Sequence, residues 1–190
     1  MALYTHIDEV VTEFQLRSGL RCPEGCGECC LTSDVHVTVL EMLPIANQML
    51  CDGTVDQWLG RLSGAAESDA CVLYKTLPAK SIQGHCGYYK WRPVLCRLFG
   101  FAAVRGRTAS KSLVVCRHIR RNDPQAAVAA MRMSDEAPSF LHYSSEVYNL
   151  DPVLGLHLMP INTALRQAIE RLGLLLSYAY REKLRDNPAA

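Results

Sequence analysis

Four cysteines within nine residues are the feature that most constrains how this chain folds. Cys22, Cys26, Cys29 and Cys30 occur in the stretch RCPEGCGECC, and the last two are adjacent. The glycines and the proline between them favour an irregular loop over a helix or a strand. Such a loop could form a disulfide knot, a metal or iron–sulfur site, or a redox pair, or the cysteines could cluster by chance, so the rest of the chain has to decide.

The other cysteines argue against disulfides. The chain has nine in all, and an odd number cannot pair completely. The N-terminus lacks a basic start followed by an apolar run, and no stretch of 18 apolar residues is present, so we expect a cytoplasmic protein without a membrane span. In a reducing cytosol, a dense set of cysteines indicates metal binding or catalysis.

Length and apolar spacing predict one mainly α-helical domain. The 190 residues carry a formal net charge of +1, from which we expect no binding to nucleic acid. Capping boxes are predicted at Thr38-x-x-Glu41 and Thr54-x-x-Gln57. Apolar residues at helical spacing predict helices over residues 5–18, 38–50, 54–62, 124–133, 138–150 and 162–184.

The cysteine-rich stretch itself is expected to be irregular. Residues 71–100 read as loop, with a short helix from Pro93 that carries Cys96 and ends near Gly100. Residues 101–115 predict a short β-hairpin around Gly106. We therefore expect a cysteine-cluster body over residues 1–118 and a helical C-terminal segment over 119–190 that packs on it as part of one domain.

Eight cysteines are candidate metal ligands. Cys51 lies on a predicted helix, where it is expected to be a small buried residue. Neighbouring side chains such as those of Cys29 and Cys30 point apart, so one of the two is expected to serve a second site or to stay a free thiol. Two four-thiolate sites, or one site and a labile group, would use the remaining set of Cys22, Cys26, Cys29, Cys30, Cys71, Cys86, Cys96 and Cys116.

The cysteine spacing does not separate zinc from an iron–sulfur cluster. Structural zinc favours two short knuckles, and the pairs Cys22/Cys26 and Cys26/Cys29 have that spacing. The second half does not, because nine residues separate Cys86 from Cys96. Ligands scattered singly along the chain favour a buried cluster.

The combined pattern resembles the CxxCxxCC family of zinc- or iron-chelating proteins (YkgJ-like). The resemblance covers about residues 21–100, with a three-residue first gap where the family commonly has two and a long insert between Cys71 and Cys86. The matching features are the cysteines ending in Cys29-Cys30, then Glu41 on a helix, Cys71 before an apolar segment, Cys86 before an aromatic residue, and Arg92-Pro93-x-x-Cys96-Arg97 before Phe99. The resemblance implies a bound zinc ion or iron–sulfur cluster. It also extends to flagellin lysine N-methylase, although no glycine-rich turn for a methyl donor is visible here.

Other residues near the cysteines have two interpretations each. Arg92 and Arg97 flank Cys96 and either offset an anionic centre or are ordinary surface residues. His85 and His118 are each either a zinc ligand or an exposed histidine. Glu41 either caps its own helix or orients the cysteine loop. An aromatic set is expected to shield the centre from water, namely Tyr74, Tyr88, Tyr89 and Trp91.

The sequence leads to one hypothesis and three alternatives. The first is an iron–sulfur protein of the 4Fe–4S type, with room for a second site, that transfers electrons or supports a partner enzyme. Whether it is itself an enzyme is left open by the sequence; if it is, a redox enzyme or a protein methyltransferase is expected. The alternatives are a structural zinc adaptor, an S-adenosylmethionine-dependent protein lysine methyltransferase, and a metal-storage protein. A protein partner is expected, and the apolar stripe of residues 162–184 allows a homodimer.

Overall fold

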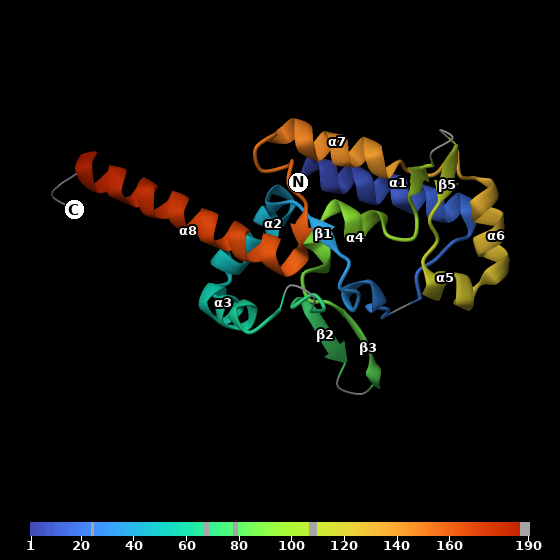
Figure 1. The fold of residues 1–190 in the computed structure, drawn as a ribbon, viewed down its shortest axis with the longest axis horizontal. Coiled ribbons are helices and arrows are strands. Elements are labelled where there is room, and N and C mark those ends of the chain that lie inside the picture. Colours follow the sequence, from blue (N-terminus) through green and yellow to red (C-terminus); the bar gives the residue numbers. More distant parts are fainter. Residues whose placement is uncertain (24, 67–68, 78–79, 107–109, 187–190) are drawn as a thin grey trace.

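The computed structural model describes all residues except 24, 67–68, 78–79, 107–109 and 187–190. It confirms a mainly α-helical fold with small antiparallel strand pairs (Figure 1). The α-helices of the described residues are α1 (Ala2–Ser18), α2 (Val39–Cys51), α3 (Val55–Ser63), α4 (Val94–Leu98), α5 (Arg117–Asn122), α6 (Pro124–Arg132), α7 (Phe140–Leu150) and α8 (Ile161–Asp186). Two short 3-10 helices are η1 (Glu28–Cys30) and η2 (Tyr89–Trp91).

Three antiparallel ladders join segments of the described chain. The first pairs β1 (His36–Val37) with β6 (Met159–Pro160) and so brings the start of α2 beside the start of α8. The second is the hairpin of β2 (Tyr74–Leu77) and β3 (Lys80–Cys86), and the third pairs β4 (Ala103–Arg105) with β5 (Lys111–Leu113). The third ladder confirms the hairpin predicted over residues 101–115. The second lies in residues 71–100, which were expected to be rich in loops and for which no hairpin was predicted.

Local signals explain where several helices begin and end. At α2, the Thr38 hydroxyl accepts from the Glu41 N–H at 3.3 Å and the Glu41 carboxylate accepts from the Thr38 N–H at 2.9 Å, which confirms the predicted capping box. The second predicted box is wrong, because the Thr54 hydroxyl donates to the Met49 carbonyl and makes no cap bond to α3. Helix α1 ends at Gly19, whose φ of 72° is the left-handed conformation that glycine tolerates.

Two apolar cores flank the cysteine-rich segment. One core joins α1, α4, α6 and α7 with the β4–β5 ladder, around residues such as Ile7 and Leu98. The other joins α2, α3 and the first half of α8, around residues such as Met42 and Leu165. Cys30 and Cys71 pack in the second core, whereas Cys116 packs against the first. The cysteines therefore lie where the two cores meet.

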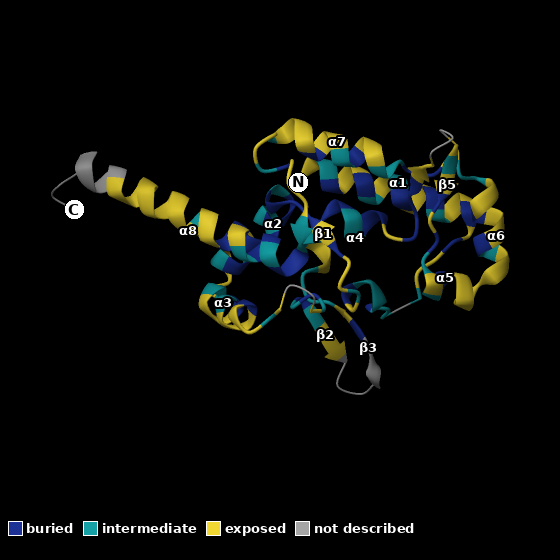
Figure 2. Ribbon diagram, viewed as in Figure 1, coloured by how far each residue is buried: buried dark blue, intermediate teal, exposed yellow. Residues whose placement is uncertain are grey.

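Helix α8 extends well beyond the part of it that packs. Its first half, including Leu165 and Ile169, is buried on α2, and the rest projects from the body (Figures 1 and 2). The predicted stripe continues along this outer half, but Leu176 and Tyr180 are 53% and 65% exposed. The homodimer stays a prediction. No helix within the described residues is both long and apolar enough to cross a membrane.

Candidate metal centre

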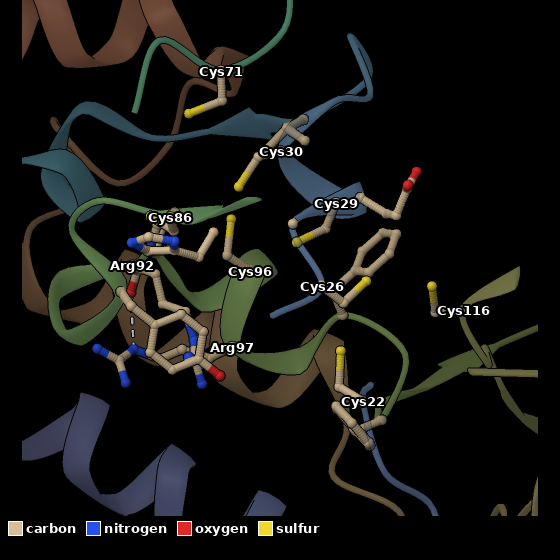
Figure 3. Close-up of a pocket in the computed structure, with 18 of the residues that line it drawn as sticks. Cys22, Cys26, Cys29, Cys30, Cys71, Cys86, Arg92, Cys96, Arg97 and Cys116 are labelled. Carbon is tan, nitrogen blue, oxygen red and sulfur yellow. Dashed lines mark hydrogen bonds between the residues drawn. The ribbon is translucent and has the colours of Figure 1, made fainter. Parts of the chain in front are cut away.

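One cavity of about 490 Å³ brings all eight candidate cysteines together (Figure 3). The thiols come from five separate parts of the chain. The cysteine loop, which we define as residues 21–31, carries four; the others stand before β2, at the end of β3, within α4, and at the N-cap of α5. In chain order they are Cys22, Cys26, Cys29, Cys30, Cys71, Cys86, Cys96 and Cys116.

The cysteine loop is held closely against the β2–β3 hairpin. The Cys71 N–H donates to the Cys30 carbonyl at 2.9 Å, which ties the loop to the segment that leads into β2. Gly27 faces the hairpin so closely that a Cβ atom there would lie 2.5 Å from Tyr74 and 2.6 Å from the Gly84 carbonyl oxygen. Glycine at position 27 is therefore required by packing rather than by backbone conformation.

Helix α4 positions Cys96 through contacts at both of its ends. The Glu41 carboxylate, besides capping α2, accepts from the Val94 N–H at 3.0 Å. The capping interpretation of Glu41 is confirmed, whereas its second contact is to α4 and not to the cysteine loop. At the other end, Arg97 donates to the carbonyls of Arg92 and Lys90 and pairs with Asp8 of α1.

The eight thiols divide into two groups in the cavity. Figure 3 shows Cys30, Cys71, Cys86 and Cys96 on one side, Cys22, Cys26 and Cys116 on the other, and Cys29 between them. The most buried and the most exposed thiols lie on opposite sides, because Cys71 is only 5% exposed whereas Cys22 is exposed, and Cys86, Cys96, Cys26 and Cys116 are all intermediate. The cavity therefore runs from a buried inner end at Cys71 to an outer end near the surface at Cys22.

Hydrogen bonding and burial give the thiols different pKa values. Hydrogen bonding with the Cys30 side chain lowers the pKa of Cys29 and that of Cys86 to about 7 each. The same hydrogen bonds raise the pKa of Cys30. Desolvation raises the pKa of Cys71 to about 12 and that of Cys96 well above its ordinary value. Cys29 and Cys86 are therefore readier to become thiolates than Cys30, Cys71 and Cys96, whose raised pKa values mean that their ionisation calls for a cation among them.

Arg92 supplies positive charge to the cavity. Its side chain is 13% exposed, and its Nε is buried without a hydrogen-bond partner among the described residues. Attraction to this guanidinium contributes, after the hydrogen bond from Cys30, to the lowered pKa of Cys29 and of Cys86. An unpartnered donor beside several thiols fits an anionic thiolate centre, and sulfur ligands suit zinc, copper(I) or an iron–sulfur cluster.

The remaining candidates lie at the margin of the cavity or away from it. His85 lines the cavity, whereas the Nε2 of His118 lies 3.1 Å from the Glu28 carboxylate. Cys51 is exposed at the end of α2, so the expectation that it is buried was wrong. In the conformation shown, no three described His, Cys, Asp or Glu side chains are close enough together to hold a single metal ion.

Helix α1 contributes to the cavity although no sequence motif marked it. Asp8, Val11, Thr12 and Gln15 line the cavity. Their spacing places them on one face of a helix, a signal visible in the sequence. The sequence alone does not show that this face meets the cysteines. Tyr89 also lines the cavity but is 63% exposed, so it does not shield the centre as expected.

Comparison with known proteins identifies the family. The family model CxxCxxCC, described as "Putative zinc- or iron-chelating domain", matches residues 21–119, which is more than half of the chain and includes all eight cavity cysteines. Comparison with curated proteins and with solved structures gave no match. The chain belongs to the CxxCxxCC family of zinc- or iron-chelating domains.

Proposed function

We propose that this metal-binding chain is an iron–sulfur protein of the 4Fe–4S type that transfers electrons or supports a partner enzyme. Family membership supports metal binding, and the finer assignment is ours. The observation that carries it is the convergence of eight thiols, and the exclusion of the ninth, at one cavity that the Arg92 guanidinium also lines. Thiolates converging from scattered positions are the ligand set that iron–sulfur clusters use.

The two groups of thiols suggest how the ligands are shared. We assign the inner site to Cys30, Cys71, Cys86 and Cys96, which lie together in Figure 3. The outer group has three members on its own side, and Cys29 lies between the groups, so it would complete a second set of four. This assignment divides the adjacent pair Cys29-Cys30 between two sites. The two thiols do not point apart as the sequence predicted, because they are hydrogen-bonded to each other, so the two sites would be neighbours.

The residues of the chain would control the environment of such a site. A 4Fe–4S cluster, when bound, accepts and donates single electrons. Cys30 and Cys71 sit in an apolar core, which keeps water from the inner site. Arg92 places a positive charge and a free N–H donor beside the thiolates, which favours the more negative state of a thiolate centre and raises its reduction potential.

Elemental analysis of protein purified without oxygen tests the proposal. We expect a brown protein that contains iron and acid-labile sulfide in comparable amounts, with an absorption band that bleaches on reduction. Iron content also tests the division into sites, because two clusters hold twice the iron of one. A colourless protein with stoichiometric zinc would overturn the iron–sulfur assignment and favour the structural zinc adaptor.

Single cysteine variants test the ligand set. Cys71→Ser and Cys96→Ser should each lower the iron and sulfide content, because serine oxygen is a poor ligand for these ions. Cys51→Ser is the matched control, since this exposed thiol does not line the cavity. A loss of iron in Cys51→Ser, or full iron content in both cavity variants, would contradict the assignment.

A further inference from the structure

Charge is strongly segregated along this nearly neutral chain. Residues 71–122 contain eleven lysine and arginine residues and no aspartate or glutamate. The rest of the chain holds the other nine basic residues and all nineteen acidic ones. The overall net charge of +1 therefore conceals a basic segment, and this segment also carries four of the eight cavity cysteines.

Six of these basic side chains face solvent in the part of the segment that the structure describes. The described ion pairs that involve the segment are those of Arg92 and Arg97 with Asp8 and of His118 with Glu28. No salt bridge within the described residues engages the exposed members, which are Lys75, Lys90, Arg105, Arg117, Arg120 and Arg121. Their positive charge is thus available to a partner.

Several of them lie next to residues that line the cavity, such as Cys116, Ile119 and Tyr89. Helix α5 begins directly after Cys116, a cavity residue, and its three arginines are exposed (Figure 2). Across the cysteine loop lies the β2–β3 hairpin (Figure 1), where the Lys75 side chain runs over Gly87 next to Cys86. Lys90 belongs to η2, between Tyr89 and Trp91. We call the following set the basic rim: Lys75, Lys90, Arg117, Arg120 and Arg121.

Apolar side chains lie inside the basic rim. Tyr89 and Phe99 line the cavity and are 63% and 37% exposed. An apolar centre within a charged periphery is the usual anatomy of a protein–protein interface. Charged peripheries of this kind steer encounter between partners of opposite charge.

We propose that the basic rim docks an acidic protein. Carboxylate side chains of that partner would lie against α5 and the β2–β3 hairpin, and an apolar patch would cover Tyr89 and Phe99. This docking goes beyond the proposed function and does not depend on which metal the cavity holds. If the metal centre is a cluster, the same contact brings the partner to the end of the cavity where Cys22 is exposed.

A protein fits this surface better than a nucleic acid does. The Arg92 guanidinium covers one face of Tyr89, at 3.7 Å from the ring centroid, so that face is closed to base stacking. The carboxylates of Asp8 and Glu28 also line the cavity and are 48% and 32% exposed, so they would repel phosphate groups. Carboxylates of a protein partner can be arranged to avoid them.

Binding to a carboxylate polymer tests the docking. Fluorescein-labelled poly-L-glutamate is titrated with the anaerobically purified full chain, and anisotropy is followed over a range of salt concentrations. We expect binding that weakens as salt rises, and a loss of about tenfold or more in Arg120→Glu/Arg121→Glu. The neutral pair Arg120→Gln/Arg121→Gln should lose less affinity for the polymer. Circular dichroism checks that each variant is folded.

The control pair is Arg171→Glu/Arg181→Glu, which makes the same charge change at exposed positions of α8. It should bind within about twofold of the unchanged chain. Equal losses of affinity in the α5 and α8 pairs would overturn the proposal, and so would a failure to bind poly-L-glutamate. Tighter binding of labelled DNA of equal charge would overturn it as well. A zinc-loaded chain that still binds upholds the docking and overturns only the iron–sulfur assignment. An iron–sulfur protein that does not bind overturns only the docking.

Discussion

The carboxylate of Asp8 pairs with the guanidinium of Arg97, and this contact joins α1 to the helix that carries Cys96. The Arg97 side chain is 1% exposed, and its ring contact with Tyr4 adds a second link to α1. Asp8 lies outside the residues matched by the family model, whereas Arg97 lies within them. The N-terminal helix is thus built into the family domain as one wall of the metal cavity.

Replacing Asp8 by asparagine should destabilise the fold. Asparagine keeps the shape of the side chain but leaves the buried charge of Arg97 without its counter-ion. Because Asp8 itself is half exposed, we expect a loss of about 1–3 kcal/mol in the free energy of unfolding, measured by urea denaturation. Asp34→Asn, at an exposed aspartate, is the matched control. Equal stability of the two variants would contradict the role of Asp8.

Glu41 should make stability depend on pH. Burial raises the pKa of its carboxyl, although hydrogen bonds from Thr38 and Val94 oppose the rise. The folded state therefore binds this proton more tightly than the unfolded state does, so the contribution of Glu41 to stability falls as pH rises from about 4 towards the raised pKa. The variant Glu41→Gln lacks this titrating group, so its free energy of unfolding should not carry this dependence on pH. The stability of the unchanged chain, measured relative to the variant, should therefore decline over that pH range.

Urea denaturation at a series of pH values measures that difference. The variant should also be less stable by about 1–3 kcal/mol, because an amide cannot accept at both of the positions where the carboxylate does. Glu9→Gln, at an exposed residue of α1, is the matched substitution. A slope of the same sign and size with Glu9→Gln would show that the effect does not come from Glu41.

Gly27→Ala should disturb the metal centre from within the cysteine loop. The added Cβ would collide with Tyr74 and with the backbone of Gly84, so the loop must move away from the hairpin. We expect a loss of about 1–3 kcal/mol in stability and a lower metal content per chain. Gly60→Ala provides the contrast, because a Cβ there meets nothing within 4 Å and should stabilise α3 by about 0.5–1 kcal/mol. Full metal content in Gly27→Ala would show that the loop tolerates the shift.

The two halves of α8 should respond differently to truncated leucines. Leu165 is 1% exposed, and Leu165→Ala should cost about 2–5 kcal/mol in thermal or urea unfolding. Leu175 is 55% exposed, and Leu175→Ala should change stability by about 0.5 kcal/mol or less. A large loss in Leu175→Ala that depends on protein concentration would instead reveal a dimer through the outer half of α8.

Local sequence signals determined much of the fold and of the candidate site. The Thr38–Glu41 capping box, the helical periods and the β4–β5 hairpin all depend on interactions within a few residues along the chain, so their patterns are legible in the sequence. The cysteine pattern likewise indicated the family and the eight thiols that line the cavity. Local patterns failed at β2–β3, where Pro78 and the glycines favour loop although the strands pair and pack on the cysteine loop.

Only the tertiary structure decided how these parts meet. It placed Cys30 beside Cys71, brought Asp8 of α1 to Arg97, and left Cys51 exposed at the end of a helix that is otherwise largely buried. It also brought the basic rim close to the cavity, although the segregation of charge along the chain can be seen in the sequence. These relationships join residues far apart in the chain, and which surfaces cover one another depends on the packing of the whole core rather than on any local pattern.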